Sequence, residues 1–149
     1  LTFTLLNASG QHARFAAMAR EYGLEGCAVS RDAVHPVTEL PRLYRASDLC
    51  IQASKAEGFG WSPREALSCG VPVIVSDVGG MRGDFEGMGL GYPPGDAGAL
   101  AEKIRQALAD PAGMRAMALK GRAYVLERYG RKKAMDDLKR LIEEVRHGC

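Results

Sequence analysis

The sequence predicts an α/β domain in which helices flank a doubly wound parallel sheet. Short apolar segments of strand length alternate with segments whose apolar residues follow helical spacing. Two glycine-bearing turns, 57–60 and 77–80, directly follow two of these strands. Since ligands of parallel α/β sheets bind beyond the carboxyl ends of the strands, both turns are expected on one ligand-binding edge.

The predicted strands are short runs of apolar and β-branched residues. They cover residues 1–6, 26–30, 49–53, 71–76 and 88–92. Helical spacing of apolar residues predicts helices over 11–22, 39–45 and 63–69, and three more that start near 96, 110 and 131, the last of them over 131–147. Together these elements are expected to form a single domain over residues 1–149.

Three helix starts carry a residue suited to capping. Asp96 and Asp110 precede helical patterns, and Ser62 is followed by Pro63, which suits a first helical position. Glu65 stands three residues after Ser62, as in a capping box. A capping role for Glu65 is therefore one interpretation of this stretch.

Composition excludes several classes of function. The net charge is +2, from 20 basic and 18 acidic residues, which does not favour nucleic acid or an acidic membrane surface. No apolar run approaches a membrane span. The four cysteines are scattered, as are the three histidines, so we expect free thiols in a reducing compartment, His12 and His35 at the surface, and no metal site.

The stretch 57–65, with the sequence Glu-Gly-Phe-Gly-Trp-Ser-Pro-Arg-Glu, has the most specific chemistry. A strand, a glycine turn and a helix start together form a common cradle for anions. The cradle is flanked by Glu57 and Glu65, and a carboxylate can accept two hydrogen bonds from a sugar diol. The pattern indicates a ligand that contains both phosphate and sugar.

Four segments resemble one enzyme family. They are 43–48 (Leu-Tyr-Arg-Ala-Ser-Asp), the 57–66 motif Glu-Gly-Phe-Gly-x-x-Pro-x-Glu-Ala, 69–80 with its terminal Gly-Gly, and 93–96 (Pro-Pro-Gly-Asp). This combination is similar to retaining GT-B glycosyltransferases of the group 1 class, which includes bacterial mannosyltransferases and glucosyltransferases and the glycogen synthases. The likeness is to their Rossmann-like C-terminal domain, which binds the nucleotide sugar, and it covers residues 1–145.

The resemblance implies a role for each matched position. Glu65 corresponds to the glutamate that binds the ribose hydroxyls of the donor, and Glu57 to the catalytic glutamate beside the donor sugar. The backbone of Gly58, Phe59 and Gly60 would face the sugar and diphosphate, and the loop 30–34 would lie near the base. The family needs no cofactor and usually no divalent metal, because basic side chains and a helix terminus balance the diphosphate charge.

Two departures from the family pattern stand out. The family has an earlier strand that ends in an Arg and, a few residues on, a Lys, both of which grip the diphosphate. Here they would precede Leu1, so we expect a fragment without its first strand and a gap in the sheet between strands 1–6 and 49–53. The family's N-terminal domain, which would bind the acceptor sugar, lipid or protein, would also be missing. The segment 7–10 (Asn-Ala-Ser-Gly) stands where the family often has Gly-Asp-Gly.

The resemblance therefore implies the donor-binding part of a cytoplasmic enzyme that transfers a sugar from a nucleoside diphosphate with retention. Contact with the inner face of the membrane would come through the missing domain, and the chain alone would be incomplete and inactive. Two other functions stay open: a non-catalytic partner-binding or regulatory module of the same fold, and a sugar-nucleotide epimerase.

Several residues also have simpler interpretations. Glu57 could be a solvated loop charge, and Gly79-Gly80 only a turn. Arg82 could bind phosphate, but a lone loop arginine is usually solvated. Trp61 could cover a sugar ring, although a hydrophobic staple against Ala66 at the helix start is the favoured interpretation.

Overall fold

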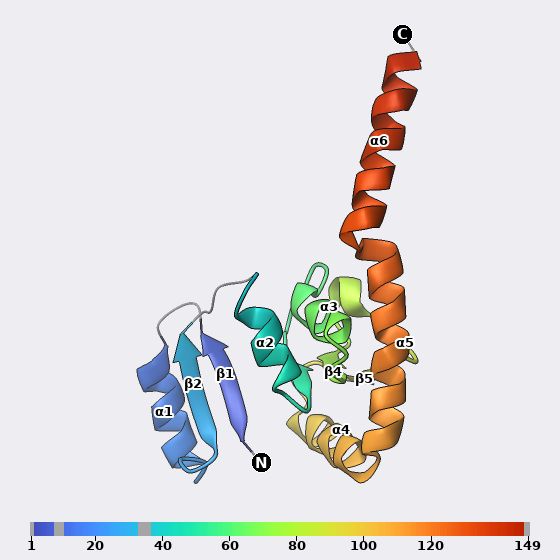
Figure 1. Cartoon of the computed structure of the whole chain (residues 1–149). Helices are drawn as coiled ribbons and strands as arrows, with labels where there is room; N and C mark the ends of the chain where they lie inside the picture. The colour runs from blue at the N-terminus through green and yellow to red at the C-terminus, as the bar shows by residue number, and fades with distance from the viewer. Residues whose placement is uncertain (1, 8–10, 33–36, 148–149) are drawn as a thin grey trace. The chain divides into compact units, whose positions relative to one another are not determined.

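The computed structural model describes residues 2–7, 11–32 and 37–147 (Figure 1). The chain divides into two compact units, residues 1–40 and 41–149. Strands and helices alternate through residue 109, and every strand pair in the described residues is parallel. The predicted parallel α/β architecture is confirmed. The prediction of one domain over residues 1–149 stays a prediction.

The first unit contains β1 (Phe3–Asn7), α1 (His12–Glu21) and β2 (Ala28–Asp32), and its two strands pair in parallel. His12 is half-buried rather than a plain surface residue. Its Nε2 lies 2.7 Å from Oδ1 of Asp32, and its Nδ1 lies 2.8 Å from Oγ of Ser30. The imidazole therefore ties the start of α1 to β2. His35 and residues 8–10 of the predicted turn lie outside the described residues.

The second unit holds a three-stranded parallel sheet in the order β3-β4-β5. Its elements are α2 (Leu40–Arg45, which begins at the boundary of the units), β3 (Cys50–Gln52), α3 (Trp61–Ser68), β4 (Val73–Ser76), the 3-10 turn η1 (Gly79–Met81), β5 (Leu90–Tyr92), α4 (Ala97–Ala109), α5 (Pro111–Tyr129) and α6 (Arg131–His147). Strand pairing thus forms two sheets, β1-β2 and β3-β4-β5. The predicted gap between strands 1–6 and 49–53 stays a prediction.

The core of the second unit surrounds β4, whose four residues are all buried. Helix α3 contributes the fully buried Ala66 and Leu67, and α5 packs against it. Gly121 of α5 makes this packing close, since a Cβ there would lie only 2.7 Å from a methyl group of Leu67. The central strand is thus held rigidly below the turn that follows it.

The predicted caps of α4 and α5 are confirmed. Asp96 accepts a hydrogen bond from the Ala99 N–H at 2.9 Å, and Asp110 accepts one from the Gly113 N–H at 2.8 Å. Each carboxylate satisfies a backbone donor that the first helical turn leaves without a partner.

The predicted cap at Ser62 is wrong. Helix α3 begins at Trp61, and its N-cap is Gly60, which has a left-handed φ of 75° and makes no side-chain capping bond. Ser62 and Pro63 therefore lie inside the first turn. Because the chain enters the helix through the left-handed glycine, the helix starts earlier than the sequence pattern indicates.

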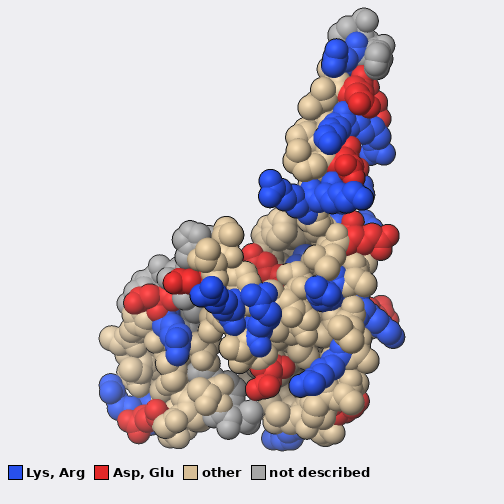
Figure 2. Space-filling model, viewed as in Figure 1, with Lys and Arg blue, Asp and Glu red and all other residues tan. Residues whose placement is uncertain are grey.

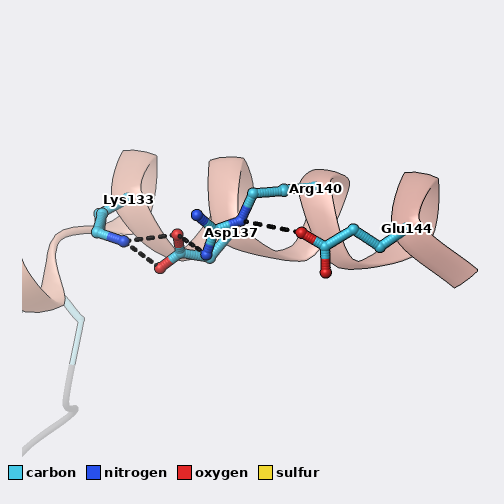
Figure 3. A network of polar contacts seen from close by, with 4 residues as sticks. All are labelled: Lys133, Asp137, Arg140 and Glu144. Atoms are coloured by element: carbon cyan, nitrogen blue, oxygen red, sulfur yellow. Dashed lines mark hydrogen bonds and ion pairs between the residues drawn. The ribbon is translucent and has the colours of Figure 1, made fainter.

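Helix α6 carries a dense mixture of charges along its length (Figure 2). Four of them form a ladder (Figure 3): Lys133 Nζ lies 2.5 Å from Asp137, and Arg140 reaches both Asp137 and Glu144, at 3.5 and 3.8 Å. The hydrogen bond from Lys133 lowers the pKa of Asp137. No helix in the described ranges is long and apolar enough to cross a membrane.

Candidate functional site

The two glycine-bearing turns meet beyond the carboxyl ends of neighbouring strands. Strands β3 and β4 pair in parallel, and the Ser76 hydroxyl at the end of β4 donates to the Ser54 carbonyl at 2.7 Å. Further along, the Gly80 N–H donates to the Glu57 carbonyl at 3.2 Å. The prediction that both turns share one edge of the sheet is confirmed.

The Gly79-Gly80 pair permits this close approach. A Cβ at Gly79 would lie 2.2 Å from the Glu57 carbonyl oxygen, and one at Gly80 would lie 1.8 Å from that of Gly58. These obstacles are backbone atoms, which cannot rotate aside. Gly79 also has a φ of 46°, in the left-handed region that disfavours side chains. The two glycines therefore form a turn, and they also allow this turn to contact the 57–60 turn, which larger residues would prevent.

An open hollow of about 660 Å³ lies where the turns meet. Its walls carry two acidic side chains, Glu57 and Asp77, and two basic ones, Lys55 and Arg82. Arg82 is exposed and lies 3.8 Å from Asp77, so the prediction of a solvated side chain agrees with the structure. The remaining lining residues are Ala56, Gly58, Val78, Gly79 and Pro94. The hollow can therefore present both charge signs to one polar ligand.

Glu57 is half-buried at this hollow and its carboxylate is held in place. One oxygen accepts the Gly58 N–H at 3.1 Å, and the other accepts Nε2 of Gln52 at 3.4 Å. A freely solvated loop charge would have no such partners. Each oxygen still has a lone pair available, so the carboxylate can accept ligand hydroxyls.

Glu65 lies on α3 and is not among the residues that line the Glu57 hollow. It is half-buried, and the hydroxyl of Tyr44 donates to its carboxylate at 3.1 Å. Burial, reinforced by Cys50 and the charge of Glu65, raises the pKa of Tyr44 above its ordinary value. Burial likewise raises the pKa of Cys50 to about 11. Tyr44 therefore stays protonated near neutral pH and orients Glu65, which does not form a capping box.

The middle of the 57–65 stretch turns toward an aromatic cluster. Phe59 packs against Trp61, with ring centroids 4.6 Å apart, and against Tyr129 at 5.2 Å. Phe59 and Gly60 are not among the residues lining the hollow, whereas Gly58 is. Trp61 is the first helical residue and 62% exposed, so it does not occupy the position before a cap that the favoured staple requires.

The described residues offer no cluster for a metal ion. Within them, no group of three or more His, Cys, Asp or Glu side chains could hold a metal. Cys27, Cys50 and Cys69 are free thiols. The charge available at the hollow is that of the side chains and backbone dipoles around it.

Sequence reasoning missed two basic residues of this region. Lys55 lines the hollow, and its position just before Glu57 was the available signal. Arg64 is only 3% exposed and is paired with Asp84. No local pattern distinguishes Arg64 from a solvated helix charge, because its carboxylate partner Asp84 and the rings of Phe85 and Tyr129 come from distant parts of the chain.

The fold and the glycine-rich edge define a class: the chain corresponds to the C-terminal, Rossmann-like half of GT-B glycosyltransferases. Sucrose-phosphate synthase from Thermosynechococcus elongatus is similar over 98% of this chain and 39% of its own, with a TM-score of 0.86 and 30% identity. HepE of Anabaena, solved with UDP, shares the fold at a TM-score of 0.84 and 22% identity, over 97% of this chain and 41% of its own.

The sequence profile described as "Glycosyl transferases group 1" matches residues 9–133, so the chain belongs to this family. O-antigen chain mannosyltransferase B of Escherichia coli is 40% identical over 75 residues, which are 50% of this chain and 20% of that protein. D-inositol 3-phosphate glycosyltransferase 1 of Catenulispora acidiphila is 37% identical over 84 residues, 55% and 20% of the two chains. The chain thus spans about a fifth of the length of these relatives.

Proposed function

We propose that this chain is the part of a retaining glycosyltransferase that binds the sugar donor, a nucleoside diphosphate sugar. The observation that carries the proposal is the joining of the Glu57 turn to the Gly79-Gly80 turn around one polar hollow. Membership of the group 1 family supports the same conclusion. The base, the sugar and the acceptor stay open, since the relatives named above differ in what they transfer to or bind.

The charged residues of the hollow suit the parts of such a donor. Lys55 and Arg82 can balance the diphosphate, and an arginine fork can bind two phosphate oxygens at once. Glu57 can accept hydrogen bonds from sugar hydroxyls close to the anomeric carbon. Glu65, which Tyr44 orients and which does not line the hollow, would bind the ribose hydroxyls, as the resemblance to the family implies.

The proposed reaction breaks the bond between the anomeric carbon and the β-phosphate oxygen, and the electron pair leaves with the nucleoside diphosphate. The acceptor hydroxyl forms the new glycosidic bond on the same face and passes its proton to the departing diphosphate oxygen. Positive charge develops on the sugar in the transition state, and the Glu57 carboxylate would stabilise it. The basic side chains would stabilise the departing diphosphate.

Substitution of the two glutamates tests the assignment. In the enzyme at its natural length, Glu57→Gln should lower kcat by at least about tenfold, because a neutral amide stabilises developing positive charge less well than a carboxylate. Glu65→Gln should mainly raise the KM for the donor. Glu127→Gln, which changes an exposed carboxylate of α5, is the control and should match wild type.

Steady-state rates of nucleoside diphosphate release, measured with UDP-sugars and GDP-sugars, provide the readout. Release that needs an acceptor indicates transfer, whereas an epimerase would release no free diphosphate. Unchanged kcat and KM in both glutamate variants would refute the site.

A further inference from the structure

Arg64 is a buried cation behind the glycine turn, outside the hollow itself. It is only 3% exposed and stands in the first half of α3, a helix that is buried on one side. Its guanidinium donates to the Phe59 carbonyl, to the Gly60 carbonyl at 3.2 Å, and to the Asp84 carboxylate. The planar fork of an arginine can serve all three acceptors at once, whereas the single ammonium of a lysine is less suited to this geometry.

Three aromatic rings surround the same guanidinium. Its central carbon lies 3.9 Å from the ring centroid of Phe59, 4.9 Å from that of Phe85 and 5.6 Å from that of Tyr129. Stacking on aromatic faces stabilises a desolvated cation, and Asp84 supplies the counter-charge. The cluster joins the glycine turn to the segment after Gly79-Gly80 and to the end of α5.

The contacts with two carbonyl groups determine how the turn is oriented. A peptide group is planar, and its N–H points opposite to its C=O. When Arg64 holds the carbonyls of Phe59 and Gly60, the N–H groups of Gly60 and Trp61 must point away from Arg64. In the described residues these two N–H groups donate to no protein acceptor. Gly60 is buried and does not line the hollow, so the orientation of the turn bears on a ligand through Glu57 and Gly58, which do line it.

The conformation that Arg64 holds is one that the turn would leave readily without support. Gly60 has a φ of 75°, and glycine has more backbone freedom than any other residue. The carbonyl contacts therefore select one conformation from several that are accessible. Met81 also packs against this point, since a Cβ at Gly60 would lie 2.6 Å from its sulfur.

We propose that Arg64 is a positioning residue for donor binding: it clamps the 57–60 turn from behind, so that Glu57 and Gly58, which line the hollow, hold the geometry that the donor requires. The inference rests on the proposed function and extends it to a residue that does not line the hollow. Arg64 would act through the turn and through Asp84.

Two substitutions at the natural length of the enzyme test the clamp. Arg64→Met keeps the side-chain stem and removes the fork, and Arg64→Lys keeps the charge but cannot reproduce the fork. Both should raise the donor KM by at least about tenfold, since small displacements of a binding group have large effects. The KM for the acceptor should not change.

Arg122→Met is the matched control. Arg122 donates from α5 to the Ser68 carbonyl at 3.0 Å, at the opposite end of the same helix α3. Arg122→Met also removes an arginine that holds a backbone carbonyl, but one away from the 57–60 turn, so its donor KM should match wild type. Melting temperatures establish which variants are folded at the assay temperature. Hydrogen exchange of the Gly80 N–H, which donates to the Glu57 carbonyl, should increase in Arg64→Met only.

If Arg64→Met and Arg64→Lys fold poorly, chemical rescue of Arg64→Ala tests the same proposal. Added guanidinium ion can occupy the vacated aromatic cluster and should restore donor KM, whereas equal concentrations of methylammonium should not. The clamp is refuted by a folded Arg64→Met with wild-type donor KM, or by no selective rescue. Glu57→Gln is assayed in parallel: if it too behaves as wild type, the proposed function fails, and if it alone is impaired, only the clamp fails.

Discussion

Gly80 has no side chain, and this allows the two turns of the site to touch. The Gly80 N–H donates to the Glu57 carbonyl, while the space for a Cβ is already occupied by the Gly58 carbonyl oxygen. Position 80 therefore requires glycine because of Gly58, which lies 22 positions earlier in the chain. The hydrogen bond from Gly80 also holds Glu57 next to the 77–80 turn.

Gly80→Ala should consequently destabilise the protein and open the site. The new Cβ would overlap backbone atoms, and overpacking of this kind costs about 1–3 kcal/mol. Chemical denaturation measures the loss, and donor titration measures the effect on the site. Gly91→Ala is the control, because nothing lies within 4 Å of a Cβ there. Equal stability of the two alanine variants would contradict the proposed contact between turns.

At the scale of elements, the start of a helix is set either by neighbouring residues in the chain or by tertiary contacts. Asp96 and Asp110 cap their helices as the sequence predicts, because a short carboxylate next to a helical pattern needs only its own neighbours. Ser62 has the same local signature but caps nothing. There, Gly60 begins the helix in the left-handed conformation. Arg64 of the same helix holds its carbonyl, and Met81, 21 positions later, packs against it.

Asp110→Ala should lower the free energy of unfolding by about 1 kcal/mol, because the Gly113 N–H loses its acceptor. Asp110→Asn keeps an oxygen in the same place and should retain most of the stability. Urea denaturation of both variants at neutral pH measures the difference. If Asp110→Ala were as stable as wild type, the capping bond would contribute nothing in solution.

At the scale of the whole molecule, the chain corresponds to one part of the longer enzymes that it resembles. It covers 39% of sucrose-phosphate synthase and about a fifth of the curated relatives. Its hollow is open, and a transferase needs water excluded and an acceptor positioned beside the donor. An open donor hollow by itself meets neither requirement.

Residues 1–149 expressed alone should therefore transfer no sugar, while the enzyme at its natural length does. Release of nucleoside diphosphate in the presence of acceptor measures the difference. Circular dichroism and thermal melting provide the control that the isolated chain is folded. Transfer by the folded isolated chain would show that these residues suffice for catalysis.

The sequence by itself determined what depends on neighbours in the chain: the alternating strands and helices, the two capping aspartates, and the turns that follow strands β3 and β4. It also determined the family, because Glu57, Glu65 and the glycines lie at characteristic spacings. Only the tertiary structure decided which residues meet. Gly80 against Gly58, Tyr44 on Glu65, and Arg64 among its rings all join segments distant in sequence. The physical reason is that burial and close contact arise from packing, which local spacing does not encode.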